Sequence, residues 1–330
     1  MTTTTVSLDE PASETRPPIE ERPASRRRLN GVLPSLSPKL VVGLALAALI
    51  VLWAIVGPFL VGDPNAISTN MFAFPNGQHW LGTTQTGQDV WTQLAYGTRG
   101  SLIIGFAVGI MATVLSAIFG VLGAYIGGAI DEGFSLFTNV FLVIPGLPLV
   151  IVIGNYVPES QRGLFLIAVV LAITSWAGSA RVLRAVTLSV RNRDYVSASR
   201  VSGEKTWRIL VVEILPNLIP VMASQFVFAV IFAILGEAGL SFLGLGASGT
   251  FTLGTILFHA YNDLALTQGA WWWFVPPGLV IALFGCALSL INFAIDEIIN
   301  PKLRDQTRSA RKRWNLTRDQ LKAIEQEDVR

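Results

Sequence analysis

The chain has 330 residues, of which 52% are hydrophobic and 14% are charged, and its mean hydropathy is +0.54. This composition excludes an ordinary soluble domain and predicts a chain embedded in a membrane. The 24 Lys and Arg residues nearly balance the 22 Asp and Glu residues, and we expect no nucleic-acid partner.

Six apolar runs are long enough to cross the roughly 30 Å hydrocarbon core of a bilayer. They lie near residues 40–60, 101–126, 136–156, 164–180, 218–240 and 272–295. Lipid offers no partner to backbone polar groups, and no run alternates as a barrel strand does, so each run is expected to be a helix. The predicted fold class is an all-α integral membrane protein with six transmembrane helices.

The distribution of Lys and Arg predicts the orientation. Of the 24, 22 lie before the first run, within residues 181–208, or after residue 301, and the other two are Arg99 and Arg162. The positive-inside rule then places both termini and the 181–208 connection in the cytosol. Residues 1–36 are expected to form a disordered cytosolic arm, 37–60 the first transmembrane anchor, 61–100 an extracytoplasmic loop, 101–300 a five-helix core and 301–330 a basic cytosolic tail.

The loop predicted to be extracytoplasmic contains HWLGTTQTGQDVWTQLAYGTRG from position 79. Its candidate residues are His79, Gly82, Asp89 and Arg99, and Arg99 at the start of the second run is suited to reach the membrane interface. No metal site is expected, because neither histidine has ligand-like neighbours. Three consecutive tryptophans, Trp271, Trp272 and Trp273, are predicted to anchor the last run at the outer interface.

Two features of the runs suggest more than packing. Pro145 and Pro148 lack amide donors and should kink or interrupt the third helix. Either the kink is simple packing, or the broken helix lines a translocation pathway together with the amide of Gln225. Glu237, at the outer end of the fifth run, is costly there unless it is paired or hydrated. It either meets a cationic group of a substrate or forms a hydrogen bond with the backbone of the glycine-rich turn that follows.

The connection between the fourth and fifth runs reads DYVSASRVSGEKTWRILVVEILPN from position 194. Asp194 is suited to cap a helix of about eight residues, and Gly203 to end it in a left-handed conformation before the chain restarts through Trp207. A helix this short is marginal alone in water and is expected to be buried against a partner. The alternative is a solvated basic loop.

This segment resembles the cytoplasmic coupling loop, or EAA loop, of ABC-importer permeases, which usually reads Tyr-Val-x-Ala-Ala-Arg, then a glycine, then Leu-Pro-Asn. Residues 79–102 and 236–246 resemble two blocks of the dipeptide and oligopeptide branch of that family. The resemblance implies the type I ABC-importer permease fold with a coupling loop over 183–217. The ATPase-coupling positions that it implies are Tyr195, Ala198, Arg200, Gly203, Glu204, Leu215 and Pro216, while Ser199 and Glu213 depart from the family pattern.

The chain has no Gly-Lys dipeptide and therefore no P-loop of the usual kind. The resemblance implies a translocation subunit with no catalytic residue or cofactor of its own, and ATP and Mg on partner ATPase subunits. The implied partners are a second permease subunit, two ATPase subunits or a fused pair, an extracytoplasmic solute-binding protein and membrane lipid. The expected function is import of di- or oligopeptides by alternating access. Import of oligosaccharides or of another small solute by the same machinery is an open alternative. An ion-coupled secondary transporter is the distant alternative.

Overall fold

The computed structural model describes residues 38–299. This part of the chain is helical apart from its loops and one isolated antiparallel bridge between Thr83 and Asp89. The predicted arm over residues 1–36 and the predicted tail over 301–330 lie outside the described residues.

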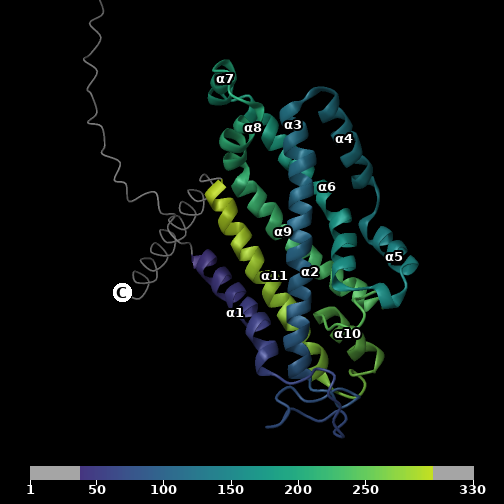
Figure 1. The fold of residues 1–330 in the computed structure, drawn as a ribbon. Helices are drawn as coiled ribbons and strands as arrows, with labels where there is room; N and C mark the ends of the chain where they lie inside the picture. The colour runs from purple at the N-terminus through teal and green to yellow at the C-terminus, as the bar shows by residue number, and fades with distance from the viewer. Residues whose placement is uncertain (1–37, 300–330) are drawn as a thin grey trace, which may run out of the picture. The chain divides into compact units, whose positions relative to one another are not determined.

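The helices follow one another along the chain, and a long loop over residues 61–89 separates the first from the second (Figure 1). The five long ones are α1 (Pro38–Leu60), α2 (Val90–Ser116), α6 (Leu164–Arg191), α9 (Leu215–Phe242) and α11 (Trp271–Ile299). A π-helical turn, η2 (Ala117–Leu122), continues α2 into α3 (Gly123–Ile126), and a second, η4 (Ile209–Ile214), joins α8 (Thr206–Arg208) to α9. The others are α4 (Gly128–Val143), α5 (Gly146–Tyr156), the 3₁₀ turn η3 (Glu159–Gln161), α7 (Asp194–Val201) and α10 (Leu253–Asn262).

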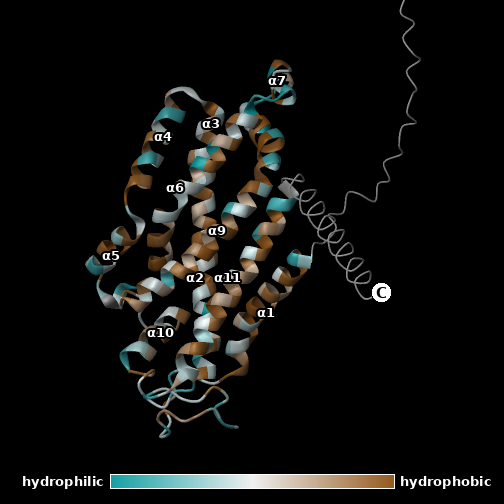
Figure 2. Cartoon of the chain, turned by 180° about the vertical axis from the view of Figure 1, so that it is seen from behind, coloured by the Kyte–Doolittle hydropathy of each residue, from teal (hydrophilic) through white to brown (hydrophobic). Residues whose placement is uncertain are grey.

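Within residues 38–299, five helices are long and apolar enough to cross a membrane: α1, α2 with α3, α6, α8 with α9, and α11. The pair α4 and α5 supplies a sixth crossing if its two parts, bent by 80°, are counted as one span. Figure 2 shows hydrophobic residues along most of α1, with polar residues at α7 and in the loops at the opposite end. The all-α membrane fold is therefore confirmed.

The break between α4 and α5 falls where the prolines predicted it. Ile144, which precedes Pro145, has an extended backbone with ψ of 122°, because the proline ring disfavours a helical conformation before it. The chain becomes helical again at Gly146, so Pro148 lies in the first turn of α5, where its missing N–H leaves no helical hydrogen bond unmade. The predicted interruption of the third helix is confirmed.

The second long helix begins at Val90 rather than near residue 101. Asp89 caps it, because its Oδ2 accepts hydrogen bonds from the backbone N of Thr92 at 2.8 Å and from Thr92 Oγ1 at 2.7 Å. The first turns also bury polar side chains, among them Gln93 and Thr98, against the protein itself. The predicted start was wrong because a helix that packs against protein needs no uniformly apolar sequence.

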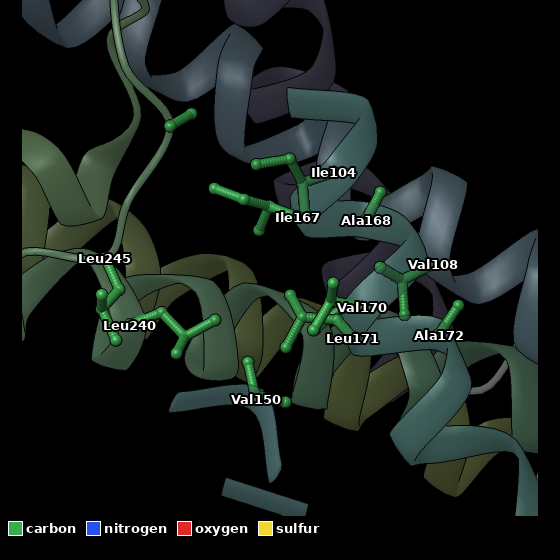
Figure 3. Packing of buried hydrophobic residues seen from close by; sticks show 12 residues of the cluster. Ile104, Val108, Val150, Ile167, Ala168, Val170, Leu171, Ala172, Leu240 and Leu245 are labelled. Carbon is green, nitrogen blue, oxygen red and sulfur yellow. The ribbon is translucent and has the colours of Figure 1, made fainter. Parts of the chain in front are cut away.

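Helix α2 packs against both α6 and α9, and glycines allow the close approach to α9. A Cβ on Gly105 would lie 2.8 Å from the Ile234 side chain, and one on Gly109 would lie 2.6 Å from that of Val230. The main hydrophobic cluster gathers side chains from α2, α5, α6 and α9 (Figure 3). Helix α1 packs on α11, where a second cluster forms.

The three tryptophans at the start of α11 differ in environment. Trp271 is 52% exposed, whereas Trp272 and Trp273 are 1% and 2% exposed. Trp272 Nε1 donates a hydrogen bond to the carbonyl oxygen of Thr83 at 3.2 Å, which ties α11 to the 61–89 loop. The prediction of three interfacial anchors is wrong for Trp272 and Trp273, which are core residues.

The contact between η2 and α6 gives a test of this packing. A Cβ on Gly120 would lie 2.4 Å from the backbone carbonyl oxygen of Ala180, which cannot rotate away. We expect Gly120→Ala to destabilise the protein by about 1–3 kcal/mol, seen as a lower thermal midpoint in detergent. Gly133→Ala is the matched control, because a Cβ there meets no atom within 4 Å. Equal midpoints for the two variants would contradict the packing.

Candidate functional site

The predicted short helix and its glycine stop are present. Helix α7 spans Asp194–Val201, and Gly203 has a φ of +76°. The backbone N of Gly203 donates to Arg200 O at 3.0 Å, and that of Glu204 donates to Ser199 O at 3.1 Å, the hydrogen-bond pair of a Schellman motif. The predicted cap is wrong, because Asp194 is the first helical residue and Arg193, at the N-cap, makes no side-chain hydrogen bond.

One face of α7 is held by the chain's own helices. Val196 is fully buried in a cluster that includes Tyr125 at the end of α3, Leu183 of α6 and Leu218 of α9. The guanidinium carbon of Arg200 lies 5.4 Å from the centroid of the Tyr125 ring, a distance suited to a cation–π interaction. Helix α7 therefore packs against α6 and η4, and Arg200 connects it to the end of α3.

The remainder of this element is exposed. Val201 is 90% exposed, Trp207 is 62% exposed and Tyr195 is 40% exposed, and Ala198 is also exposed. Apolar side chains gathered on a protruding element are typical of a protein–protein contact. Figure 1 shows α7 at the end of the long helices opposite α10 and the 61–89 loop.

The remaining predicted coupling residues lie on both sides of the connection. Glu204 forms an ion pair with Arg208, four residues later, which braces the turn after Gly203. Leu215 and Pro216 begin α9, after η4, and Pro216 is exposed. The residues on α7 and on the Gly203 turn thus form one protruding element, while Leu215 and Pro216 belong to the helix that carries it.

Arginines at this end also bind neighbouring helices. Arg184 of α6 binds Asp131 of α4 through two hydrogen bonds, Nε to Oδ1 at 2.7 Å and Nη2 to Oδ2 at 2.8 Å. Arg191 Nη1 donates to the carbonyl oxygen of Ala124 at 2.6 Å. No local sequence pattern predicts these pairs, because they join residues more than 50 positions apart.

A cleft of about 810 Å³ lies among α2, α5, α6 and α9. Its lining is mostly apolar, with Thr174, Ser175, Ser179 and Gln225 as the polar side chains, and Ser179 Oγ donates to Gln225 Oε1 at 3.0 Å. Gly146 and Leu147 line it from α5, whereas the flanking prolines, Pro145 and Pro148, do not. Of the four residues predicted for a pathway, Gln225 alone lies on this cleft, while Pro145 and Pro148 shape the helix beside it.

Glu237 is fully buried away from that cleft. Its carboxylate accepts hydrogen bonds from three hydroxyl groups: Ser101 Oγ of α2 at 3.1 Å, Ser241 Oγ at 2.7 Å and Thr252 Oγ1 at 2.5 Å. Ser101 Oγ also accepts from the backbone N of Leu253, the first residue of α10, at 2.9 Å. Glu237 thus joins α2, α9 and the start of α10 through hydroxyl groups, rather than through the backbone of the glycine-rich turn as one of the two predicted alternatives had it.

At the opposite end from α7, the predicted loop residues form a structural network. His79 Nδ1 lies 3.0 Å from Asp89 Oδ1, so the residue that caps α2 also holds the loop. Gly82 has a φ of +67°, and a Cβ there would lie 2.5 Å from Ala73 O and 2.7 Å from the Trp272 ring. Arg99 is exposed, with its guanidinium carbon 6.0 Å from the centroid of the Phe59 ring. The Asp-x-x-Thr spacing at position 89 was the signal that could have revealed the cap.

Within residues 38–299, no group of three or more His, Cys, Asp or Glu side chains is placed to hold a metal ion. The described surfaces are an exposed apolar region on α7 and α8, a cleft with few polar groups and a helix junction closed by hydroxyl groups.

Known proteins are similar to this sequence over most of its length. Residues 112–305 match the family model described as "Binding-protein-dependent transport system inner membrane component". The dipeptide transport system permease protein DppC of Bacillus subtilis (strain 168) is 33% identical over 269 residues, which cover 80% of this chain and 82% of that protein. The oligopeptide transport system permease protein OppC of Lactococcus lactis subsp. lactis (strain IL1403) is 34% identical over 241 residues, which cover 73% and 81%.

Among solved structures, an inward-facing MetNI methionine ABC transporter has a chain that is 21% identical, with a TM-score of 0.49, covering 63% of this chain and 95% of that one. The matched region contains the 183–217 connection, Glu237 and the residues described as lining the cleft except Val108, whereas Ser101 of the Glu237 junction precedes it. On the extent of the family match and of the identity to the two permease proteins, this chain belongs to the family of binding-protein-dependent transport system inner membrane components.

Proposed function

We propose that this chain is one of two membrane-spanning subunits of an ATP-driven importer that moves di- or oligopeptides into the cytosol by alternating access. Its relatives named as dipeptide and oligopeptide permeases support the peptide class. The other subunits of the complex are a second permease, two ATPase subunits that hold ATP and Mg, and an extracytoplasmic solute-binding protein. The chain itself contributes part of the translocation pathway and the element that contacts the ATPase subunit.

The observation that carries this proposal is that α7 has one side buried against the chain's own helices and another side exposed. Val196 and Arg200 attach it to the membrane-spanning helices, while Val201 at its end and Trp207 of the following α8 are exposed. Apolar surface of this kind gains stability when it is buried in a groove of a partner. A partner that grips the exposed side would therefore transmit its own motion to α3, α6 and α9 through the buried side.

The charges support the orientation in which α7 faces the cytosol. Seven of the Lys and Arg residues fall within positions 181–208, at the α7 end of the helices, whereas the 61–89 loop contains no Lys or Arg. By the positive-inside rule the α7 end is cytosolic, the 61–89 loop is extracytoplasmic, and both termini are cytosolic. The predicted arm over 1–36 and the predicted tail over 301–330 would then be cytosolic.

The cleft beside α5 is the proposed passage. Its described lining has hydroxyl and amide groups but no charged side chain, which suits the transit of varied solutes better than the binding of a coupling ion. Exposed apolar residues at its edge, including Phe232 and Leu235, give the second permease subunit a surface to cover. The bend set by Pro145 and Pro148 places α5 along this passage.

The docking of α7 can be tested by placing a charge on its exposed side. Val201→Asp should reduce the amount of ATPase subunit that co-purifies with the permease by about tenfold, because an unpaired carboxylate would be buried in the contact. Ile67→Asp is the matched control, since Ile67 is also an exposed aliphatic residue, at 74%, but lies in the 61–89 loop. If Val201→Asp co-purifies with as much ATPase subunit as the wild type, the exposed side of α7 is not part of the interface with the ATPase.

The turn at Gly203 can be tested separately. Proline cannot adopt a φ of +76°, so Gly203→Pro should strain the turn by about 1–3 kcal/mol and displace α8 relative to α7. We expect membrane insertion and basal ATP hydrolysis to persist while peptide uptake falls. Gly269→Pro changes a glycine of φ +69° near the opposite end and should spare coupling. Normal peptide uptake by Gly203→Pro would contradict a role of the Gly203 turn in coupling ATP hydrolysis to transport.

Glu237 is proposed to position α10 rather than to contact solute. Glu237→Ala removes the acceptor shared by three buried hydroxyl groups and should cost about 1–3 kcal/mol of stability, measured as a lower thermal midpoint. Glu237→Gln retains one carbonyl oxygen and should recover most of that loss, with peptide-stimulated ATP hydrolysis close to wild type. A stable Glu237→Gln variant that has lost this stimulation would instead assign Glu237 to the pathway.

A further inference from the structure

A second cavity, of about 450 Å³, lies at the end of the helices opposite α7. The 61–89 loop, the connection between α9 and α10, and α10 itself form its walls. Its volume falls in the range of small-molecule sites. The residues described as lining it are all different from those lining the cleft beside α5, so the two cavities are distinct.

One buried donor in this cavity has no acceptor. Trp273 lines the cavity and is 2% exposed, and its Nε1 forms no hydrogen bond within residues 38–299. The neighbouring Trp272 shows the usual situation, since its Nε1 donates to Thr83 O. A buried N–H without a partner costs free energy that an acceptor on a bound molecule would recover. The indole of Trp273 therefore indicates a ligand that carries a carbonyl or similar oxygen.

The polar groups around Trp273 define the rest of that ligand. Asp263, half-buried just after α10, makes no side-chain hydrogen bond or ion pair with the described residues, and the described lining includes no Lys or Arg. Gln93 Nε2 donates to Gln88 Oε1 at 2.7 Å, which leaves the amide N–H groups of Gln88 and the carbonyl oxygen of Gln93 available. The cavity thus offers a negative charge, an indole donor and an amide donor–acceptor pair.

We propose that this outer cavity binds the amino-terminal end of a short peptide. The carboxylate of Asp263 matches an α-ammonium group, the indole of Trp273 matches a main-chain carbonyl, and the glutamine pair matches the N–H and C=O of a peptide unit. A neutral sugar would satisfy the hydrogen bonds but would leave Asp263 without a counter-charge. Since this proposal rests on the proposed import of peptides, the cavity would hold peptide on the outer side before it enters the cleft.

Binding to the assembled importer in nanodiscs, without the solute-binding protein, tests this directly. The probe is tri-alanine, observed by saturation-transfer NMR, with Nα-acetyl-tri-alanine and maltotriose as comparison ligands. Asp263→Asn and Trp273→Phe should each raise the apparent Kd for tri-alanine by about three- to tenfold. The acetylated peptide should bind to the wild-type importer more weakly than tri-alanine does. The two peptides should bind equally well to the Asp263→Asn variant.

Matched controls make the same changes outside the cavity. Asp63→Asn alters an aspartate of the 61–89 loop that is not among the residues lining the cavity, and Trp271→Phe alters an exposed tryptophan two residues before Trp273. Both controls should bind tri-alanine as wild type does. Equal binding by all four variants, or maltotriose binding that exceeds tri-alanine binding and falls in the same variants, would overturn the proposal. It would also be overturned if tri-alanine gave no signal while the two cavity variants weakened attachment of the solute-binding protein.

Uptake separates this inference from the proposed function. If the complete wild-type importer takes up tri-alanine on addition of ATP, but the cavity variants bind it unchanged, the cavity proposal fails and the import proposal stands. If binding depends on Asp263 while ATP drives no uptake, the import proposal fails and the cavity proposal stands.

Discussion

The burial of Val196 fixes α7 to the helices that cross the membrane. An eight-residue helix has too few internal hydrogen bonds to persist alone, so its order depends on this contact and on the stacking of Arg200 over Tyr125. In the proposed function the same contact couples α7 to the membrane helices, because a displacement of α7 would press on the end of α3, on α6 and on η4, which leads into α9. Without it, the exposed Val201 would be attached only through the turns on either side of α7, whereas Trp207 is joined to α9 by continuous helix.

At the other end of the helices, polar contacts buried in the protein fix the loops in a similar way. Glu237 joins α2, α9 and α10 through hydroxyl groups, and Asp89 joins the 61–89 loop to α2. Such groups are stable inside a protein only where their hydrogen bonds are made. Within residues 38–299, two buried side-chain polar atoms have no partner, Thr113 Oγ1 and Trp273 Nε1. Only Trp273 lies among the residues described as lining the outer cavity, which is why that cavity and not the fully bonded Glu237 junction is inferred to bind a ligand.

Local patterns in the sequence predicted the features that depend on local physics. The proline pair predicted the break before α5, the glycine at position 203 predicted a left-handed residue, and the apolar runs predicted the membrane helices. The features that could not be predicted join distant parts of the chain: the Arg184–Asp131 pair, the hydroxyl groups around Glu237 and the burial of Trp272. A single sequence carries no information on which distant helices meet, and a buried tryptophan looks like an interfacial one until its neighbours are known.

Thiol cross-linking from α7 tests the central claim most directly. A Val201→Cys variant, in a background where the free Cys286 is replaced by serine, places one reactive thiol on the exposed side of α7. The account predicts a cross-link to the ATPase subunit in the assembled complex, with a yield that changes when ATP is added, and no labelling of intact cells by a membrane-impermeant maleimide. Labelling from outside, or the absence of any adduct with a nucleotide-hydrolysing subunit, would contradict it.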